Sequence, residues 1–432
     1  MKQEKYDVVV IGAGMGGLSA GAFLAKGGYR TLVVEKLPFI GGRASSIEHK
    51  GFQVSTGICA WELGLEDDIY KPLGAPFNVR VPQPNNVYWI NGKWHEVPEK
   101  GKLRAAITIA SGEEEADKIM KALRRALRWN EPSSSISLRD WLLQYTDNEK
   151  TLAVVAAWWK IDQVTAQAAI REIKTMGSFS YGYAVSNIGM MESLANVIRS
   201  NGGEVRTRCR ATRIIVDDGA AKGIVVTTKR GKKETQLDCK VVISDVGPYG
   251  TVRLASEENF DKGYIKEMRN AIRTFPYSVV EVVSSEPLVE YPSIGFVVGA
   301  RVVSWVCTPT MLCPELAPPG KHVTHIGQFV EPNPPWDLEK LLDLAIQDAR
   351  DFAPKYDKCV EEILHVGFWL RQEWPNYHSY NGHSLPQKTS IENLYNVGDS
   401  VFDPGYCGVW GAAISGKSVA NDVMSRVKPG EA

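Results

Sequence analysis

The stretch of residues 6–17, YDVVVIGAGMGG, constrains the fold of this chain more than any other. Residues 8–11 are a continuous apolar run, which is typical of a strand buried on both faces of a parallel sheet. Gly12, Gly14 and Gly17 then form the pattern G-x-G-x-x-G ahead of a helix-like segment. Such glycines allow a tight turn, a close approach of backbone to phosphate, and a helix–strand contact. The helix start adds free N–H groups and a partial positive charge for an anion.

A second expected strand, residues 31–34, ends at Glu35, eighteen residues after Gly17. An acid at this place can accept hydrogen bonds from the hydroxyls of an adenosine ribose. Because strand, glycines, helix, second strand and acid occur in order, we predict a dinucleotide-binding βαβ unit. The alternatives are a Gly-rich turn in an ordinary βαβ unit and a signal peptide, but residues 8–11 are too short for a signal peptide's apolar region.

A second glycine motif follows directly and carries a family resemblance. Residues 36–43 begin at Lys36 and end in Gly41, Gly42 and Arg43. The paired glycines let the backbone pass close to a ligand, and Arg43 can neutralise a phosphate. With the strand-2 acid and this motif, the chain resembles the FAD-dependent amine oxidase, phytoene desaturase and protoporphyrinogen oxidase superfamily, in which Arg43 could also reach towards the flavin side. Residues 205–248 and the Gly-Lys-His of residues 320–322 resemble its phytoene desaturase-like branch more than the amine oxidases. The resemblance implies FAD, and an α/β, two-domain, FAD-binding Rossmann-type fold with a mixed α+β substrate domain.

The carboxyl-terminal region resembles the same superfamily. Residues 393–400 are expected to be a strand that runs into Gly398 and Asp399, and a Gly/Ala-rich helix follows. The resemblance implies that Asp399 hydrogen-bonds the ribityl and pyrophosphate region, and that Gly408 and Val409 present backbone N–H groups to the flavin N1/O2 edge. A helix that starts there directs its positive end to the place where reduced flavin gathers negative charge. A Gly/Ala-rich helix packed on a sheet is the simpler alternative.

Further flavin contacts follow from the resemblance alone. It places Thr56, Gly57 and Ile58 beside the flavin ring and Ala211 against the adenine, where the family usually has valine. Cys407 lies near the expected ring but does not match the family's attachment motif, so we expect FAD to be bound non-covalently. The expected cofactor-binding residues are Gly12, Gly14, Met15, Gly16, Gly17, Glu35, Lys36, Gly41, Gly42, Arg43, Thr56, Gly57, Ile58, Ala211, Gly398, Asp399, Gly408 and Val409.

The predicted FAD-binding domain is discontinuous and comprises residues 1–75, 185–250 and 385–432. The predicted substrate-binding domain comprises residues 76–184 and 251–384. Within it we expect a hairpin with Asn91 and Gly92 in its turn, and helices that open at Ser111 and Ser137. We also expect one strand-like stretch over residues 293–308. The helices that lead up to Trp158 and Trp159 form either a lid over the substrate cavity or an ordinary helical core.

The chemistry implied by the resemblance is the transfer of a hydride from a substrate C–H bond to flavin N5. We expect a desaturase or dehydrogenase of an apolar or cyclic carbon skeleton. Two alternative enzymes are a flavin amine oxidase that forms an imine and a redox-neutral isomerase that uses reduced FAD. A third alternative is a non-enzyme like the Rab GDP-dissociation inhibitors (GDI-like), which binds a prenylated protein. The catalytic residues are unknown, and the weak candidates by location or type are Cys59, Trp61, Arg301, Tyr406 and Trp410.

The amino-acid composition limits the classes of partner that this chain can bind. Fifty basic and fifty acidic residues balance, which argues against a nucleic-acid partner, and no apolar run reaches the length of a membrane span. The seven cysteines are dispersed without a C-x-x-C pair, which favours a reducing cytoplasm and no metal site.

A basic amphipathic helix after Ser111 fits peripheral contact with the inner face of a membrane, although a solvated face is the commoner explanation. Oxygen, a quinone or a redox protein would accept the electrons, because no second G-x-G-x-x-G is present for a nicotinamide nucleotide. The oligomeric state is left open.

Overall fold

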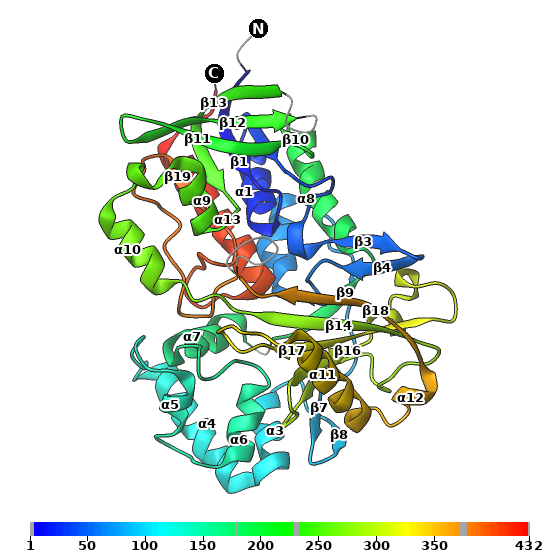
Figure 1. The fold of residues 1–432 in the computed structure, drawn as a ribbon. Helices are drawn as coiled ribbons and strands as arrows, with labels where there is room; N and C mark the ends of the chain where they lie inside the picture. Colours follow the sequence, from blue (N-terminus) through cyan, green and yellow to red (C-terminus); the bar gives the residue numbers. More distant parts are fainter. Residues whose placement is uncertain (1–3, 178, 229–232, 372–377, 431–432) are drawn as a thin grey trace.

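The computed structural model describes residues 4–177, 179–228, 233–371 and 378–430. Within these residues the strands form two seven-stranded sheets and two smaller ones (Figure 1). The first sheet has the order β10-β2-β1-β13-β12-β11, with β19 paired to β13. Its strands are β10 Glu204–Arg206, β2 Thr31–Val34, β1 Glu4–Ile11, β13 Lys233–Ser244, β12 Ala220–Thr228, β11 Arg210–Asp217 and β19 Leu394–Asn396.

The centre of the first sheet is parallel: β1 pairs with β2 and β13, β10 with β2, and β19 with β13. Because strand side chains alternate between faces, Val8 and Val10 of β1 pack into one core cluster and Val9 and Ile11 into another. Helices cover both faces, which explains the continuous apolar run. The first face carries α1 Met15–Lys26, α8 Asn187–Ser200 and α13 Gly408–Arg426, and the second carries α9 Pro248–Ala255 and α10 Lys262–Ala271.

The second sheet has the order β18-β14-β17-β16-β15-β7-β8 and is antiparallel except between β15 and β7. Its strands are β18 Val360–Trp369, β14 Tyr277–Ser284, β17 His322–Phe329, β16 Val303–Cys307, β15 Ile294–Val297, β7 Asn86–Ile90 and β8 Lys93–Glu96. One face packs on α11 Leu338–Phe352 and α12 Tyr356–Cys359. A helical group packs near the other face: α3 Lys102–Ser111, α4 Glu113–Arg128, α5 Leu138–Leu142, α6 Glu149–Ala156 and α7 Ala166–Met176.

Short elements lie outside the two large sheets. They are the hairpin β3 Ser46–His49 with β4 Phe52–Ser55, the helix α2 Lys71–Leu73, and the small sheet β5 Trp61–Glu62, β9 Tyr181–Ala184 and β6 Val79–Arg80. Figure 1 shows three of them, β3, β4 and β9, between the two large sheets. The mixed α/β architecture with a Rossmann-type first sheet agrees with the fold class predicted from the sequence.

Two local predictions in the predicted substrate-binding domain are confirmed, a turn and a helix cap. Asn91 and Gly92, both with positive φ, form the turn between β7 and β8, and the Ser137 hydroxyl accepts from the Asp140 N–H to cap α5. The expected cap at Ser111 is wrong, because Ser111 ends α3 and Gly112, with φ 96°, separates it from α4. The expected continuous strand over residues 293–308 is also wrong: β15 and β16 pair as an antiparallel hairpin.

The helix expected to be basic and amphipathic is α4. Its apolar side chains, Ala116, Ile119, Ala122, Leu123 and Ala126, are buried in the core of the helical group. This packing matches the solvated-face alternative for α4, since the apolar side faces protein. Among the helices that the structure describes, none combines the length and apolar character needed to cross a lipid bilayer.

Candidate functional site

One cavity of about 600 Å³ lies between the two large sheets. Its first end is built at the carboxyl ends of parallel strands, where β1, β2 and β13 give way to Gly12, Glu35 and Asp245. Ligands of open α/β sheets bind at this edge. Its second end is lined by side chains of the second sheet and of the helical group, such as Phe296 and Trp158. The predicted cofactor motifs and the substrate half therefore face one shared space.

The glycine fingerprint forms the turn between β1 and α1. Gly12 has φ 100°, a conformation that favours glycine, and a Cβ on Gly17 would clash with the Gly12 carbonyl. These two glycines thus make the tight turn and the helix–strand contact expected from the sequence. Gly14, expected to face pyrophosphate, lies against the carboxyl group of Asp245, whose Oδ2 would be 2.5 Å from a Cβ placed there.

Glu35 connects the fingerprint to the end of β2. Its Oε2 accepts a hydrogen bond from the Ala13 N–H at 2.9 Å, and its Oε1 accepts from the Leu37 N–H at 2.7 Å. The carboxylate is almost fully buried, yet it lines the cavity together with Lys36 and Ala211. Each carboxylate oxygen has two acceptor sites, so Glu35 retains acceptor capacity for a ligand hydroxyl.

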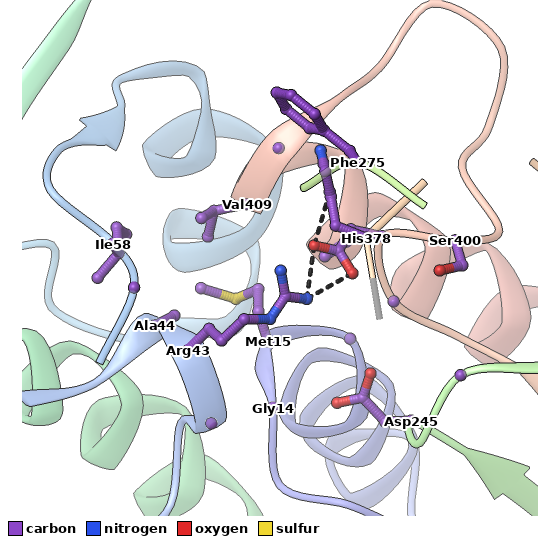
Figure 2. Close-up of a pocket in the computed structure, with 18 of the residues that line it drawn as sticks. Gly14, Met15, Arg43, Ala44, Ile58, Asp245, Phe275, His378, Ser400 and Val409 are labelled. Atoms are coloured by element: carbon purple, nitrogen blue, oxygen red, sulfur yellow. Dashed lines mark hydrogen bonds and ion pairs between the residues drawn. The ribbon is translucent and has the colours of Figure 1, made fainter. Parts of the chain in front are cut away.

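Two motifs far apart in the sequence meet in the middle of the cavity. Arg43 donates from Nη2 to both carboxylate oxygens of Asp399 at 2.7 Å, and His378 Nδ1 lies 2.9 Å from Asp399 Oδ2. Figure 2 shows the Arg43 and His378 side chains converging on this carboxylate. Burial alone would raise the pKa of Asp399, but Arg43 and His378 hold it well below the usual range. The group therefore stays ionised.

The amino terminus of α13 meets a buried acid from β5. Glu62 pairs in register with Tyr181 of β9, and its Oε1 would be 2.5 Å from a Cβ on Gly408. Burial raises the pKa of Glu62 to about 7, although the N–H groups of Val409 and Trp410 favour its charged form. Its Oε2 has no hydrogen-bond partner among the described residues. Glu62 lines the cavity, so a group that titrates near neutral pH sits where the expected flavin edge would lie.

The second end of the cavity is an aromatic chamber, lined by Trp158, Phe179, Tyr181, Phe275, Phe296 and Tyr380. Trp158 stacks on Phe296 with ring centroids 4.3 Å apart, and its Nε1 donates to the Tyr88 hydroxyl at 2.7 Å. A hydrogen bond and a stacked neighbour together hold this indole in place. The chamber presents flat apolar surfaces, which suits a planar or cyclic apolar ligand. Trp158 and Trp159 both line the cavity.

Most predicted cofactor-binding residues line this cavity: Gly12, Gly14, Met15, Gly16, Glu35, Lys36, Gly41, Gly42, Arg43, Gly57, Ile58, Ala211, Gly398, Asp399, Gly408 and Val409. Gly17 lies beneath the wall, in the helix–strand contact. Thr56 is outside the lining residues, and its hydroxyl donates to the Gly42 carbonyl at 2.8 Å. Met15, Ile58 and Val409 point towards the same space in Figure 2.

The five weak catalytic candidates are separated by the structure. Of them, only Cys59 lines the cavity. Trp61 is fully buried and donates to Asn187, whereas Arg301 forms ion pairs with Asp348 and Asp351. Trp410 donates from Nε1 to Asp68, and the ring of Tyr406 packs edge-on against Trp410. These four side chains have structural partners outside the cavity.

Asp245, Glu62 and His378 are among the ionisable cavity residues that were not predicted from the sequence. Asp245 had a usable signal, because it directly follows a parallel strand whose end must lie beside the fingerprint. Glu62 had a weaker one, a lone acid next to Trp61 in an apolar stretch. His378 had none, since the bond to Asp399 depends on the tertiary fold.

Comparisons with known proteins agree with this architecture. Residues 10–69 match the NAD(P)-binding Rossmann-like domain family. The crystal structure of an oxidoreductase from Methanosarcina mazei superposes with a TM-score of 0.83 at 26% identity, and covers 96% of this chain and 100% of its own. Putrescine oxidase bound to putrescine superposes with a TM-score of 0.71 at 15% identity over 98% and 99% of the two chains, which shows a shared fold.

Among sequence relatives, prolycopene isomerase of Daucus carota is 24% identical over 98% of this chain and 81% of its own length. All-trans-retinol 13,14-reductase of Macaca fascicularis is 27% identical over 57% of this chain, which spans about half, 48%, of that relative. Phytoene desaturase of Fusarium fujikuroi is 46% identical over 57 residues, 13% of this chain and 10% of its own. The predicted superfamily resemblance is confirmed, and the chain has the superfamily's fold. It is related to flavin-dependent oxidoreductases.

Proposed function

We propose that this protein is an FAD-dependent oxidoreductase that binds FAD non-covalently and acts as a desaturase or dehydrogenase of an apolar or cyclic carbon skeleton. One observation supports the proposal most: a single cavity joins the glycine fingerprint and Glu35 at one end to the aromatic chamber at the other. When bound, FAD supplies at N5 an acceptor for a hydride from a substrate C–H bond.

The residues of the cavity fit a dinucleotide along its length. Glu35 is placed for an adenosine ribose and the start of α1 for the pyrophosphate, since helix amino termini attract anions. The Arg43–Asp399 pair fits the ribityl region, and Gly408 begins the helix α13 that would face the flavin edge. The cavity volume of about 600 Å³ falls in the usual range of ligand sites, roughly 300–1,000 Å³.

The chain's own groups would prepare the substrate end. The aromatic chamber would exclude water and align a flat carbon skeleton through stacking contacts. Glu62, with a pKa of about 7, would hold or release a proton beside the start of α13. Burial raises the pKa of the Cys59 and Cys407 thiols well above the usual value, so both stay protonated. A protonated Cys407 is a poor nucleophile, which supports non-covalent binding.

The colour of the purified protein is the first test. We expect a yellow protein that releases intact FAD after acid or heat treatment. A colourless protein that FAD cannot reconstitute would refute the cofactor, and would favour the GDI-like binding protein. Flavin that stays attached to the denatured chain would refute non-covalent binding.

Anaerobic substrate screening is the second test. Polyenes, cyclic hydrocarbons and primary amines would each be mixed with the oxidised protein, while the flavin absorption band is followed. We expect bleaching by an unsaturated or cyclic apolar compound. Bleaching by amines alone would favour the amine oxidase. Geometric isomerisation of a polyene by the prereduced protein, without net change in the flavin band, would favour the isomerase.

Cellular setting and electron acceptor form part of the same proposal. The seven cysteines all lie in the described residues and none is in a disulfide, which supports a reducing compartment such as the cytoplasm. The burial of the apolar face of α4 removes that face as a membrane contact. Oxygen, a quinone or a redox protein would reoxidise the flavin, and the rates at which each restores the absorption of reduced protein would choose among them.

A further inference from the structure

The carboxyl group of Asp245 occupies the centre of the glycine fingerprint. Asp245 directly follows β13, and Figure 2 shows it beside the start of α1, close to Gly14. Its Oδ2 accepts from the Gly17 N–H at 3.0 Å. Its Oδ1 would lie 3.0 Å from a Cβ on Gly16 and 2.7 Å from one on Gly398. The side chain is partly exposed, and it lines the cavity at the place where a pyrophosphate is expected.

The surroundings of Asp245 do not favour a charge. Burial raises its pKa well above the usual value, and the acids Asp399 and Glu35 act in the same direction. The Gly17 N–H and Arg43 favour the ionised form, but Arg43 is already paired with Asp399. The start of α1 carries a partial positive charge, which is the site's main attraction for an anion. An ionised carboxylate at this point would compete with phosphate oxygens and repel them.

We propose that Asp245 is a pyrophosphate-binding residue that acts as a neutral carboxylic acid, with its O–H donating a hydrogen bond to a phosphate oxygen of FAD. The inference rests on the proposed function, because FAD is the ligand. The carboxyl proton stays on Asp245 when FAD binds, and an Asp245 that is ionised beforehand takes up one proton from solvent. The Asp245 O–H then adds one donor to the backbone N–H groups at the start of α1. Its Oδ2 still accepts a hydrogen bond from the Gly17 N–H.

Two substitutions separate a donor from a charge. Asp245→Asn keeps size and a hydrogen-bond donor without a titratable proton, and Asp245→Leu keeps size without a donor. FAD affinity of each apoprotein would be measured at pH 6.5 by titration of flavin fluorescence. We expect Asp245→Asn to stay within about threefold of wild type and Asp245→Leu to bind about tenfold or more weakly. An Asn variant as weak as the Leu variant, or a Leu variant equal to wild type, would overturn the proposal.

Infrared difference spectroscopy reports the protonation state directly and does not depend on activity. The spectrum of FAD-loaded Asp245→Asn would be subtracted from that of loaded wild type at pH 7.5. We expect the C=O stretching band of a protonated carboxylic acid, which shifts in D₂O. Glu62→Gln is the matched control, because it removes a different buried acid of the same cavity and should remove a different band. Only the bands of an ionised carboxylate in the Asp245 difference spectrum would overturn the proposal.

A pH series completes the test. Between pH 6 and 9 the affinity of Asp245→Asn reports only the titration of the other cavity groups, such as Glu62. Wild-type affinity should stay parallel to it, or fall by up to about tenfold per pH unit once Asp245 ionises in the apoprotein. Wild-type binding that strengthens with pH relative to the Asn variant would contradict a neutral acid. If neither wild type nor variants bind FAD at any pH, the proposed function itself fails.

Discussion

Removal of one partner from the Arg43–Asp399 ion pair should destabilise the protein strongly. The two groups are 2.7 Å apart, and their side chains are only 20% and 13% exposed. Breaking a buried pair costs about 3–5 kcal/mol, because one charge remains without compensation. The residual exposure places the expected loss for Asp399→Leu near the lower end, about 3 kcal/mol. An arginine guanidinium stays protonated in proteins, so the Arg43 cation persists, still partly buried, when Asp399 is removed.

Urea unfolding of the flavin-free proteins would measure this loss. The double variant Arg43→Met/Asp399→Leu should regain most of it, because replacing a whole buried pair by apolar groups is often close to neutral. Lys50 and Glu362 offer a matched exposed pair, also 2.7 Å apart but with side chains 55% and 41% exposed. Glu362→Gln should cost less than about 1 kcal/mol. A loss below about 1 kcal/mol in Asp399→Leu, or additive losses in the double variant, would refute the reasoning.

Three further outcomes are expected. Glu35→Ala should weaken FAD binding about 10- to 150-fold in equilibrium titration, with turnover per bound flavin almost unchanged, because it removes hydrogen bonds to a charged group remote from the reacting end. Burial raises the pKa of Glu62 from 4.5 to about 7, so its contribution to stability falls as pH rises through that window. Urea unfolding from pH 5 to 8 should therefore show Glu62→Gln gaining on wild type up to about pH 7 and then levelling, whereas a constant difference would contradict the shift. Excess NADH should leave the oxidised flavin unbleached in anaerobic stopped-flow mixing; bleaching within the turnover time would reveal a nicotinamide site.

The adenosine side of the site was predictable because its determinants are local. The turn at Gly12, the contact made by Gly17 and the acid after β2 all lie in one βαβ unit, where sequence spacing fixes spatial position. The position of Gly398 and Asp399 was also predictable, since they follow β19, a strand of the same sheet. The pairing of Arg43 with Asp399 could not be predicted from spacing, because it depends on β19 joining, beside β13, the same sheet as β2.

The substrate-binding part of the cavity was harder to predict from the sequence, for a physical reason. Its aromatic chamber collects side chains from β15, from the loop after α6 and from residues near β9, and these meet only through the second sheet. An aromatic residue that lines a cavity has the same sequence pattern as one that fills a core. Trp61 and Trp158 illustrate the point: the first is fully buried and bonded to Asn187, whereas the second lines the chamber.

The two ends of the cavity divide recognition between charge and shape. At the first end Glu35, and in the middle Arg43 and Asp399, form fixed hydrogen-bonded or ionic contacts, so a ligand there must match a defined pattern of donors and acceptors. At the second end the walls are flat rings, and the acid that borders it, Glu62, has a pKa of about 7 and is only partly ionised near neutral pH. Apolar walls discriminate weakly between ligands of similar size, by roughly 1–3 kcal/mol per methylene. A family with this architecture can therefore keep one cofactor while its substrates change, since altering the rings of the chamber leaves the charged end intact.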